Sequence, residues 1–98
     1  MSKCWCFASF YAGNLDMIGV IHANTKNEAA EKLCQASWDS KHSAYSDIQT
    51  IYEDYKYNFG DQPNFHLPQN GFEFLHMIDK LNHDVDSIAY HFDQCNLI

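Results

Sequence analysis

The sequence predicts a single-domain α+β fold: a small antiparallel three-stranded sheet (ββαβ) with one packed helix, followed by two or three short helices. Three observations support this fold class. Two apolar runs on either side of a Gly-Asn pair have the pattern of a β-hairpin. A capping box and a helix-periodic stretch follow them. After a segment that holds both prolines, apolar residues recur at helical spacing.

The hairpin is predicted from residues 3–12 and 15–22, with Gly13-Asn14 as its turn. Alternation along the first strand gives it two faces. One face carries Cys4, Cys6, Ala8 and Phe10, and the other carries Trp5, Phe7, Ser9 and Tyr11. Because neither face is polar, we expect both to be covered at least in part.

The first helix is predicted to begin after Thr25, which forms a capping box with Glu28, and to run to about Asp39. Its buried stripe is formed by five residues at helical spacing: Ala29, Ala30, Leu33, Cys34 and Trp38. Residues 39–46 are small and polar, which indicates a loop. Residues 47–57 are rich in β-branched and aromatic side chains, and we expect the third strand there.

Residues 58–70 are the expected joint between two subregions of one domain, residues 1–57 and 71–98. Asn70 is expected to cap the next helix, with Glu73 as the acidic partner of a capping box. The apolar stripe of that helix is Phe74, Leu75, Ile78 and Leu81. A last helix is expected to start at Asp84 or Asp86 and to bury Val85, Ile88, Ala89, Phe92 and Cys95.

The charge of the chain is one-sided. The formal net charge is −7, and all of it falls in residues 42–98, because residues 1–41 are net neutral. The acids of the second half are Asp47, Glu53, Asp54, Asp61, Glu73, Asp79, Asp84, Asp86 and Asp93. The chain has six lysines and no arginine, whereas a nucleic-acid binder needs a basic patch. Direct DNA or RNA binding is therefore not expected, and the partner should be basic.

This charge belongs to a folded body. Apolar residues make up 46% of the chain and aromatic residues 15%, which is too much for a disordered acidic tail. No apolar run approaches the ~20 residues that cross a bilayer, and the N-terminus lacks a signal-peptide cleavage site. We therefore expect a cytoplasmic protein whose cysteines are reduced.

Catalytic and metal-binding motifs are not found in the sequence. It has no Gly-x-Ser-x-Gly elbow and no glycine-rich phosphate loop. Glu53 and Asp54 are adjacent on the expected strand and would point to opposite faces. Neither an enzyme nor a cofactor is expected. The cysteines are expected mainly in the core, with a zinc site or two disulfides as alternatives: Cys4, Cys6, Cys34 and Cys95.

The order of several short motifs resembles the N-terminal and central parts of ArdA-type antirestriction proteins, acidic DNA mimics carried by mobile elements. The similar residues are Ala8-Ser9-Phe10, Gly13, Leu15, Asp54-Tyr55, Phe74, Leu75, Ile78, Leu81 and Ile88-Ala89-Tyr90. The chain departs from the family at Met17-Ile18-Gly19, where a Gly-aromatic pair is usual, and it lacks the family's C-terminal dimerisation region. The resemblance therefore implies a one-module DNA mimic that would cover only a short site.

Charge and resemblance together predict an acidic DNA-mimic inhibitor of phage or mobile-element origin. It would block the DNA-binding groove of a host defence complex, either a CRISPR surveillance complex (an anti-CRISPR) or a type I restriction enzyme. The nine acids would be its contacts, with Tyr55 and Tyr57 at the rim. The alternative is an acidic protein–protein interaction module without DNA mimicry, which would bind through Tyr57, Phe59 and Phe65. Mimicry requires the acids to converge on one face.

Overall fold

The computed structural model describes residues 3–11, 13–60 and 66–95. It confirms an α+β fold with one three-stranded antiparallel sheet and three helices, in the order ββαααβ. The elements are β1 (Lys3–Tyr11), β2 (Asn14–Ala23), α1 (Lys26–Ser37), α2 (Tyr45–Phe59), α3 (Gly71–Asp84) and β3 (Ile88–Gln94).

The sheet has the strand order β2-β1-β3, so that the N-terminal strand lies in the middle. The expected hairpin is confirmed, because β1 pairs with β2 from Tyr11 opposite Asn14 to Lys3 opposite Ala23. Its turn differs by one residue: Asn14, expected in the turn, is the first residue of β2.

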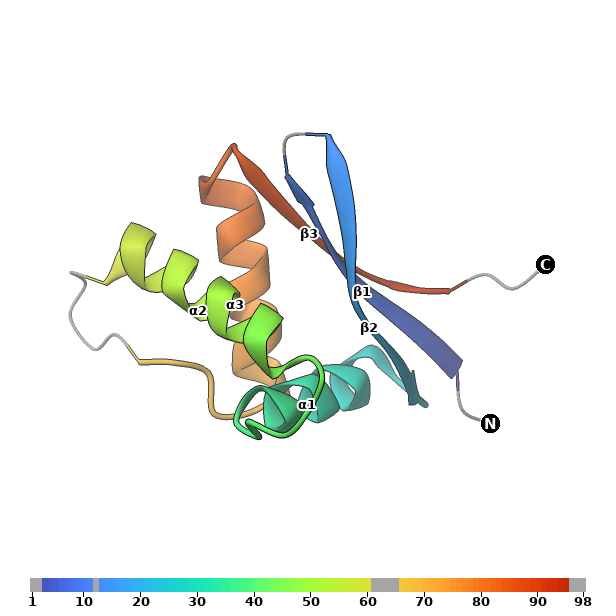
Figure 1. Cartoon of the computed structure of the whole chain (residues 1–98). Coiled ribbons are helices and arrows are strands. Elements are labelled where there is room, and N and C mark those ends of the chain that lie inside the picture. The colour runs from blue at the N-terminus through green and yellow to red at the C-terminus, as the bar shows by residue number, and fades with distance from the viewer. Residues whose placement is uncertain (1–2, 12, 61–65, 96–98) are drawn as a thin grey trace.

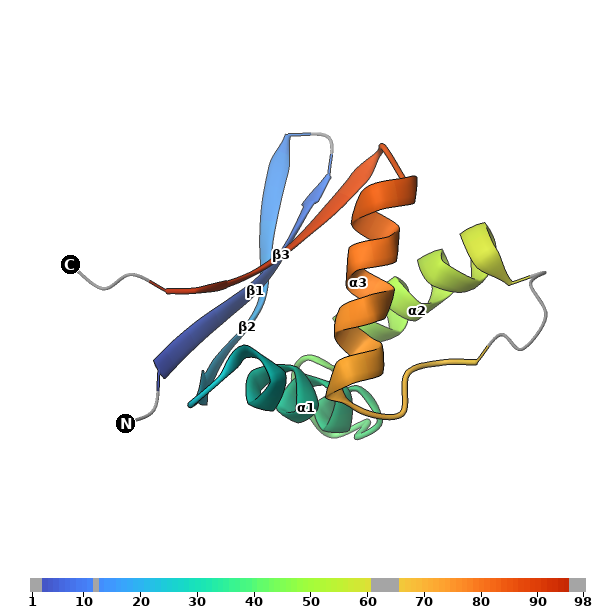
Figure 2. The same cartoon turned by 180° about the vertical axis from the view of Figure 1, so that it is seen from behind.

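Figures 1 and 2 show all three helices on one side of the sheet. We call the opposite side the outer face. Among the described elements no helix or strand packs on it, but on this face of β1 Ala8 is buried and Cys4 and Cys6 are half-buried, so the face is covered in part, as expected.

The expected third strand at residues 47–57 is wrong, because these residues belong to helix α2. The apolar side chains that α2 buries stand at positions i, i+3, i+4 and i+11, which share one face of a helix: Ile48, Ile51, Tyr52 and Phe59. Asp47 in the first turn and Lys56 in the last turn also suit the helix macrodipole. The helical period of the buried side chains therefore outweighs the strand propensity of individual residues.

The expected last helix is also wrong, because its residues form strand β3. Tyr90 and Phe92 are buried and alternate with exposed His91 and Asp93, which is the period of a strand with one covered face. The pairing partner is β1, with Phe7 opposite Phe92. That partner lies at the other end of the chain, so local helical spacing alone did not reveal it.

Helices α1 and α3 begin as predicted. The Thr25 hydroxyl accepts a hydrogen bond from the backbone N–H of Glu28 at 3.1 Å. The Asn70 side chain accepts one from the backbone N–H of Glu73 at 2.9 Å. Four of the five expected stripe residues of α1 are buried, but Trp38 lies just beyond the helix and is 48% exposed. It stacks on Tyr52 of α2 with ring centroids 5.4 Å apart.

The core lies between the sheet and the helices, and Phe7 is at its centre. Phe7 is fully buried, and its ring meets the edges or faces of Phe74, Tyr90 and Phe92 at centroid distances of 5.7, 6.3 and 5.7 Å. Phe74 belongs to α3, and Tyr90 and Phe92 belong to β3. The Phe7 side chain therefore packs the middle strand against both elements. The core is therefore assembled from residues far apart in the sequence.

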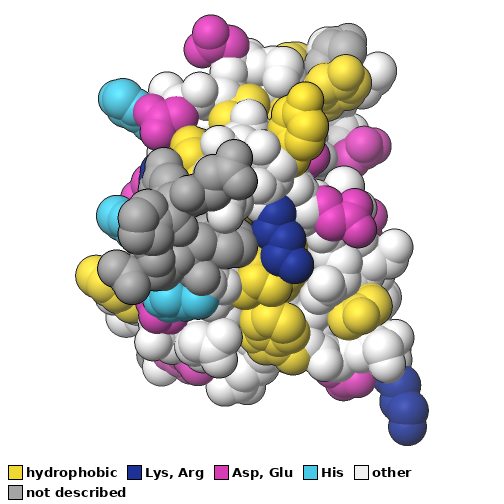
Figure 3. All heavy atoms as spheres, turned by 90° about the vertical axis from the view of Figure 1, so that its left-hand side faces the viewer, with side chains coloured by type: hydrophobic (Ala, Val, Ile, Leu, Met, Phe, Trp, Pro, Cys, Tyr) yellow, Lys and Arg dark blue, Asp and Glu magenta, His cyan; other side chains and the backbone are white. Residues whose placement is uncertain are grey.

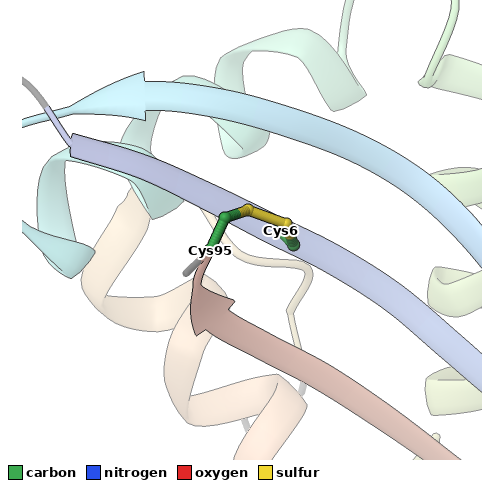
Figure 4. The surroundings of a disulfide bond; sticks show 2 residues. All are labelled: Cys6 and Cys95. Atoms are coloured by element: carbon green, nitrogen blue, oxygen red, sulfur yellow. A yellow bond between two sulfur atoms is a disulfide. The ribbon is translucent and has the colours of Figure 1, made fainter. Parts of the chain in front are cut away.

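The expectation of reduced cysteines is corrected by a disulfide between Cys6 of β1 and Cys95, which follows β3 (Figure 4). Their Cα atoms are 5.8 Å apart, a usual distance for a disulfide. Cys34 is a buried thiol of α1, and burial raises the pKa of that thiol. Cys34 lies in the helical layer, whereas the other three cysteines lie in or beside the sheet. The four therefore do not form a zinc site.

Gly71, the first residue of α3, lies against the backbone of α1. A Cβ atom at this position would lie 2.6 Å from the Glu31 nitrogen and 2.9 Å from the Asn27 carbonyl oxygen. We expect Gly71→Ala to lower the free energy of unfolding by about 1–3 kcal/mol, because two helix backbones must separate. Chemical denaturation would measure this. Gly19→Ala, whose Cβ would meet only side-chain atoms at 3.9 Å or more, is the matched control, and equal losses would contradict the close approach.

Candidate functional site

A cleft of about 790 Å³ opens between α2 and the hairpin end of the sheet. Its walls are α2 on one side and parts of all three strands on the other, with Val85 and Ser87 of the α3–β3 turn at one end. Its volume lies within the ~300–1,000 Å³ of ordinary ligand pockets. It is larger than a second hollow, of about 480 Å³, which lies beside β2 and α1.

Three carboxylates line this cleft: Asp16 from β2, and Asp47 and Asp54 from α2. Asp47 and Asp54 are seven residues apart, two helical turns, so they lie on one face of α2. The other lining residues, all within the described ranges, include no Lys, Arg or His. The hollow therefore concentrates negative charge without an internal cation to neutralise it. We call it the acidic cleft.

Asp54 is the most constrained of the three. It is half-buried, and its Oδ2 accepts a hydrogen bond of 3.0 Å from the hydroxyl of Tyr90 on β3. Burial, and then the hydrogen bond to Asp54, raise the pKa of Tyr90 well above its usual value. The tyrosine therefore stays protonated and donates to the carboxylate, which fixes Asp54 between helix and sheet. Asp16 and Asp47 are exposed at the mouth.

The rest of the lining is apolar or uncharged. Ile18, Ile51 and Ile88 supply aliphatic surface on the cleft walls, and Tyr11 and Tyr57 supply aromatic rings at its rim. The Tyr57 side chain is 90% exposed. A hollow with carboxylates, aliphatic walls and rim aromatics suits the side chains of Arg and Lys, which combine an apolar stem with a cationic head.

Two of the nine predicted contact acids, Asp47 and Asp54, lie in the acidic cleft. Glu73 lies in the first turn of α3, where its carboxylate caps the helix by accepting a hydrogen bond from the backbone N–H of Gln69 at 3.0 Å. Asp84 pairs with His83, and this hydrogen bond raises the pKa of the imidazole. Asp61 lies outside the described residues. The other four are exposed on α2, α3, the α3–β3 turn and β3: Glu53, Asp79, Asp86 and Asp93.

Asp79, Asp86 and Asp93 are spaced seven residues apart, but they do not lie along one helix. Asp79 lies on α3, Asp86 in the following turn, and Asp93 opposite Cys6 on the outer face of the sheet. Figure 3 shows acidic side chains at separate places on the coloured part of one face, with hydrophobic and uncharged side chains between them. On that face the acids form no continuous stripe among the described residues.

Asp16 is the site residue that the charge count missed, because it belongs to the neutral half of the chain. A signal for it was present. The hairpin turn sets Asp16 opposite Ser9, on the side of β1 that also carries Phe7. An acid on the core side of a hairpin is unusual, and hairpin register alone could have drawn attention to it.

The aromatic patch expected for the alternative function is only partly exposed. Phe59 is buried at 9% exposure, and the Lys80 ammonium lies 4.4 Å from its ring centroid. Tyr55 packs beside Phe59 with centroids 5.0 Å apart and is half-buried. Phe65 lies outside the described residues. Of the two tyrosines expected at the rim, only Tyr57 lines the cleft and is widely exposed.

No group of three or more His, Cys, Asp or Glu side chains in the described part of the chain could hold a metal ion. Within the same part, no helix is long and apolar enough to span a membrane.

Tyr52 provides a test of the packing between α1 and α2. It is buried, its hydroxyl hydrogen-bonds to Ser37, and burial raises the pKa of Tyr52 to about 12. Above pH 10 the unfolded chain loses the proton while the folded protein keeps it. The contribution of Tyr52 to the free energy of unfolding is therefore fully present below pH 10, and it should be lost between pH 10 and about 12.

Urea denaturation at several alkaline pH values would show this fall. Tyr52→Phe should make it shallower, because the buried hydroxyl is gone. Tyr57→Phe, which removes a hydroxyl already in solvent, should leave it unchanged. If the Tyr52→Phe protein showed the same fall as the wild type, Tyr52 would not be the buried group responsible.

Comparison with known proteins adds no relative: no family model matches the chain, and no curated protein or solved structure matches it significantly.

Proposed function

We propose that this protein is a non-enzymatic acidic interaction module that receives Lys or Arg side chains of a basic partner in the acidic cleft. The observation that carries this proposal is the convergence of Asp16, Asp47 and Asp54 on one hollow that no cationic side chain of the described residues lines. Basic segments are attracted to such a cleft at long range, because low-dielectric walls focus the field of the carboxylates.

The shape of the site supports protein binding over mimicry of a whole duplex. A DNA mimic must present its charges on a convex surface that enters the partner's groove. Here the acids that lie together line a concavity, and the other acids are spread over α2, α3, β3 and the turn before it. A concave site fits projecting side chains, such as those of a basic loop or tail.

DNA mimicry is the second candidate, supported by the net charge of −7 and by the resemblance to ArdA-type proteins. In this version the partner is the basic DNA-binding surface of a restriction or CRISPR complex, and the protein acts in the cytoplasm of a bacterial host. The glutathione and thioredoxin systems there would favour reduction of the Cys6–Cys95 pair. The nine acids would then contact the DNA-binding groove of the partner at separate points and would not form one continuous stripe.

The test is a titration of isotope-labelled protein with a short peptide of alternating Arg and Gly residues, followed by NMR. We expect saturable shifts of backbone amides along α2 and the cleft ends of β1 and β3. Binding should weaken as salt rises from about 50 mM to about 200 mM, because exposed charges are screened. A matched peptide with Gln in place of Arg should not shift these amides. Scattered, non-saturable shifts would contradict a defined cleft site.

Competition with DNA separates the two candidates. For mimicry, the protein should displace duplex DNA from a type I restriction enzyme or a CRISPR surveillance complex, and reversal of three or four of the nine acids to Lys should abolish this. If the protein binds Arg peptides but does not compete with DNA, the result supports the interaction module and not DNA mimicry.

A further inference from the structure

Three of the four cysteines lie together on the outer face of the sheet. Cys4 and Cys6 are two residues apart on β1, so both side chains point to the same face. The β1–β3 register sets Trp5 opposite Gln94, which places Cys95 directly opposite Cys4. The backbone confirms this position, because the N–H of Cys95 donates to the carbonyl of Cys4 at 2.8 Å.

The disulfide does not join this opposite pair. Cys95 bonds to Cys6, which sits diagonally across the ladder, and Cys4 remains a thiol. Directly opposite residues of a hydrogen-bonded antiparallel pair have Cα atoms about 5.5 Å apart. That distance falls inside the range of about 4.4–6.8 Å at which disulfides form. Cys95 is therefore within bonding distance of two cysteines and can bond only one of them.

We propose that Cys4, Cys6 and Cys95 form a thiol–disulfide exchange site in which Cys95 changes partner between Cys6 and Cys4. This proposal is independent of the function assigned to the acidic cleft. Solvent reaches the site: Cys4 and Cys95 are only half-buried, and Figure 4 shows the disulfide on the side of β1 away from the helices.

The exchange is balanced within the chain. Cys4 releases its proton to water, and the thiolate attacks the sulfur of Cys95. A bond forms between Cys4 and Cys95 while the bond between Cys95 and Cys6 breaks, and its electron pair leaves on the sulfur of Cys6. Cys6 then takes a proton from water. One disulfide and one thiol remain, so no oxidant or reductant is consumed.

Attack on Cys95 is favoured over attack on Cys6 by the geometry of the strand. A bond between Cys4 and Cys6 would join residues two apart in an extended strand, roughly 6.6 Å between Cα atoms, near the upper limit for a disulfide. The site thus has two accessible pairings, and each leaves one reactive thiol on the outer face. In the exchanged form that thiol is Cys6, opposite the exposed side chain of Val20.

Peptide mapping of the oxidised wild-type protein tests the proposal without any mutation. The protein is held at pH values from about 6 to about 8.5, because thiol–disulfide exchange proceeds through the thiolate and speeds up as the pH rises. Free thiols are then blocked with N-ethylmaleimide in denaturant at the lowest pH. Trypsin cuts after Lys3 and Lys26, so one peptide carries Cys4 and Cys6, and fragmentation on either side of Trp5 locates the label.

We expect label on Cys6 in at least about a tenth of the molecules, reached faster at higher pH because the thiolate is the attacking species. Label confined to Cys4 after prolonged incubation at the highest pH would overturn the proposal. Cys4→Ser is the matched control, in which Cys6 should stay unlabelled at every pH.

A second variant tests the alternative pairing directly. Cys6→Ser, oxidised with oxidised glutathione, should form a bond between Cys4 and Cys95. A Cys6→Ser protein that keeps its circular dichroism spectrum but never forms this bond would also overturn the proposal. If this variant does not fold, the wild-type mapping still decides.

Discussion

Replacing the three cleft carboxylates with amides, Asp16→Asn, Asp47→Asn and Asp54→Asn together, should weaken binding of a basic partner by about 20- to 4,000-fold. The half-buried Asp54 should account for most of the loss, because a charge-assisted hydrogen bond contributes about 1.5–3 kcal/mol. The exposed Asp16 and Asp47 should add about 0.2–1 kcal/mol each. Each 1.4 kcal/mol corresponds to roughly a tenfold change in affinity.

Asparagine is the informative replacement at Asp54, because its carbonyl oxygen can still accept the hydrogen bond from Tyr90. The triple variant should therefore keep the melting temperature of the wild type to within a few degrees while it loses binding. Fluorescence anisotropy with the Arg-containing peptide would measure the affinity, and circular dichroism would measure the stability.

The matched control removes the same amount of charge outside the cleft. Glu53→Gln, Asp79→Asn and Asp93→Asn together change the net charge equally, but all three side chains are exposed and none lines the cleft. We expect less than about a threefold loss of affinity, because solvent-exposed charges that do not line the cleft contribute little to binding and are screened by salt. If the two triple variants lost affinity equally, overall charge would govern binding and the DNA-mimic candidate would gain support.

The sequence predicted the elements whose signals are local. The hairpin followed from two strand-like runs and a turn, and α1 and α3 followed from side chains that cap their own first turns. Helix α2 was also within reach of local reasoning. Ile48, Ile51, Tyr52 and Phe59 repeat with the helical period, but the β-branched and aromatic side chains of the same segment favour a strand.

Strand β3 and the acidic cleft depend on contacts that no local window contains. Residues 88–94 fit either a short helix stripe or a strand, and only pairing with β1 decides between them. Likewise Asp16 and Asp54 come from opposite halves of the chain, and they line one cleft because the fold places α2 beside the hairpin. A count of charge along the sequence could therefore identify an acidic protein but could not identify which acids act together.

Phe7→Ala should lower the free energy of unfolding by about 3–5 kcal/mol. Phe7 is completely buried, and its removal leaves a cavity among the three rings of Phe74, Tyr90 and Phe92. A domain of this size is stable by only about 5–15 kcal/mol. Urea denaturation under non-reducing conditions would measure the loss. Phe72→Ala, at a side chain that is 76% exposed, is the matched control and should cost less than about 1 kcal/mol.

Reduction of the Cys6–Cys95 disulfide should unfold the Phe7→Ala variant. The Cys6–Cys95 bond joins residues 89 positions apart, and a crosslink over a loop of that length stabilises a protein by about 4–5 kcal/mol in the chain-entropy model. Oxidised Phe7→Ala should remain folded, whereas the reduced variant should lose most of its circular dichroism signal at low urea. Exchange of the bond to Cys4 lengthens the loop by only two residues, so oxidised protein should be equally stable with either pairing. A reduced Phe7→Ala protein as stable as the oxidised one would show that the crosslink does not restrain the unfolded chain.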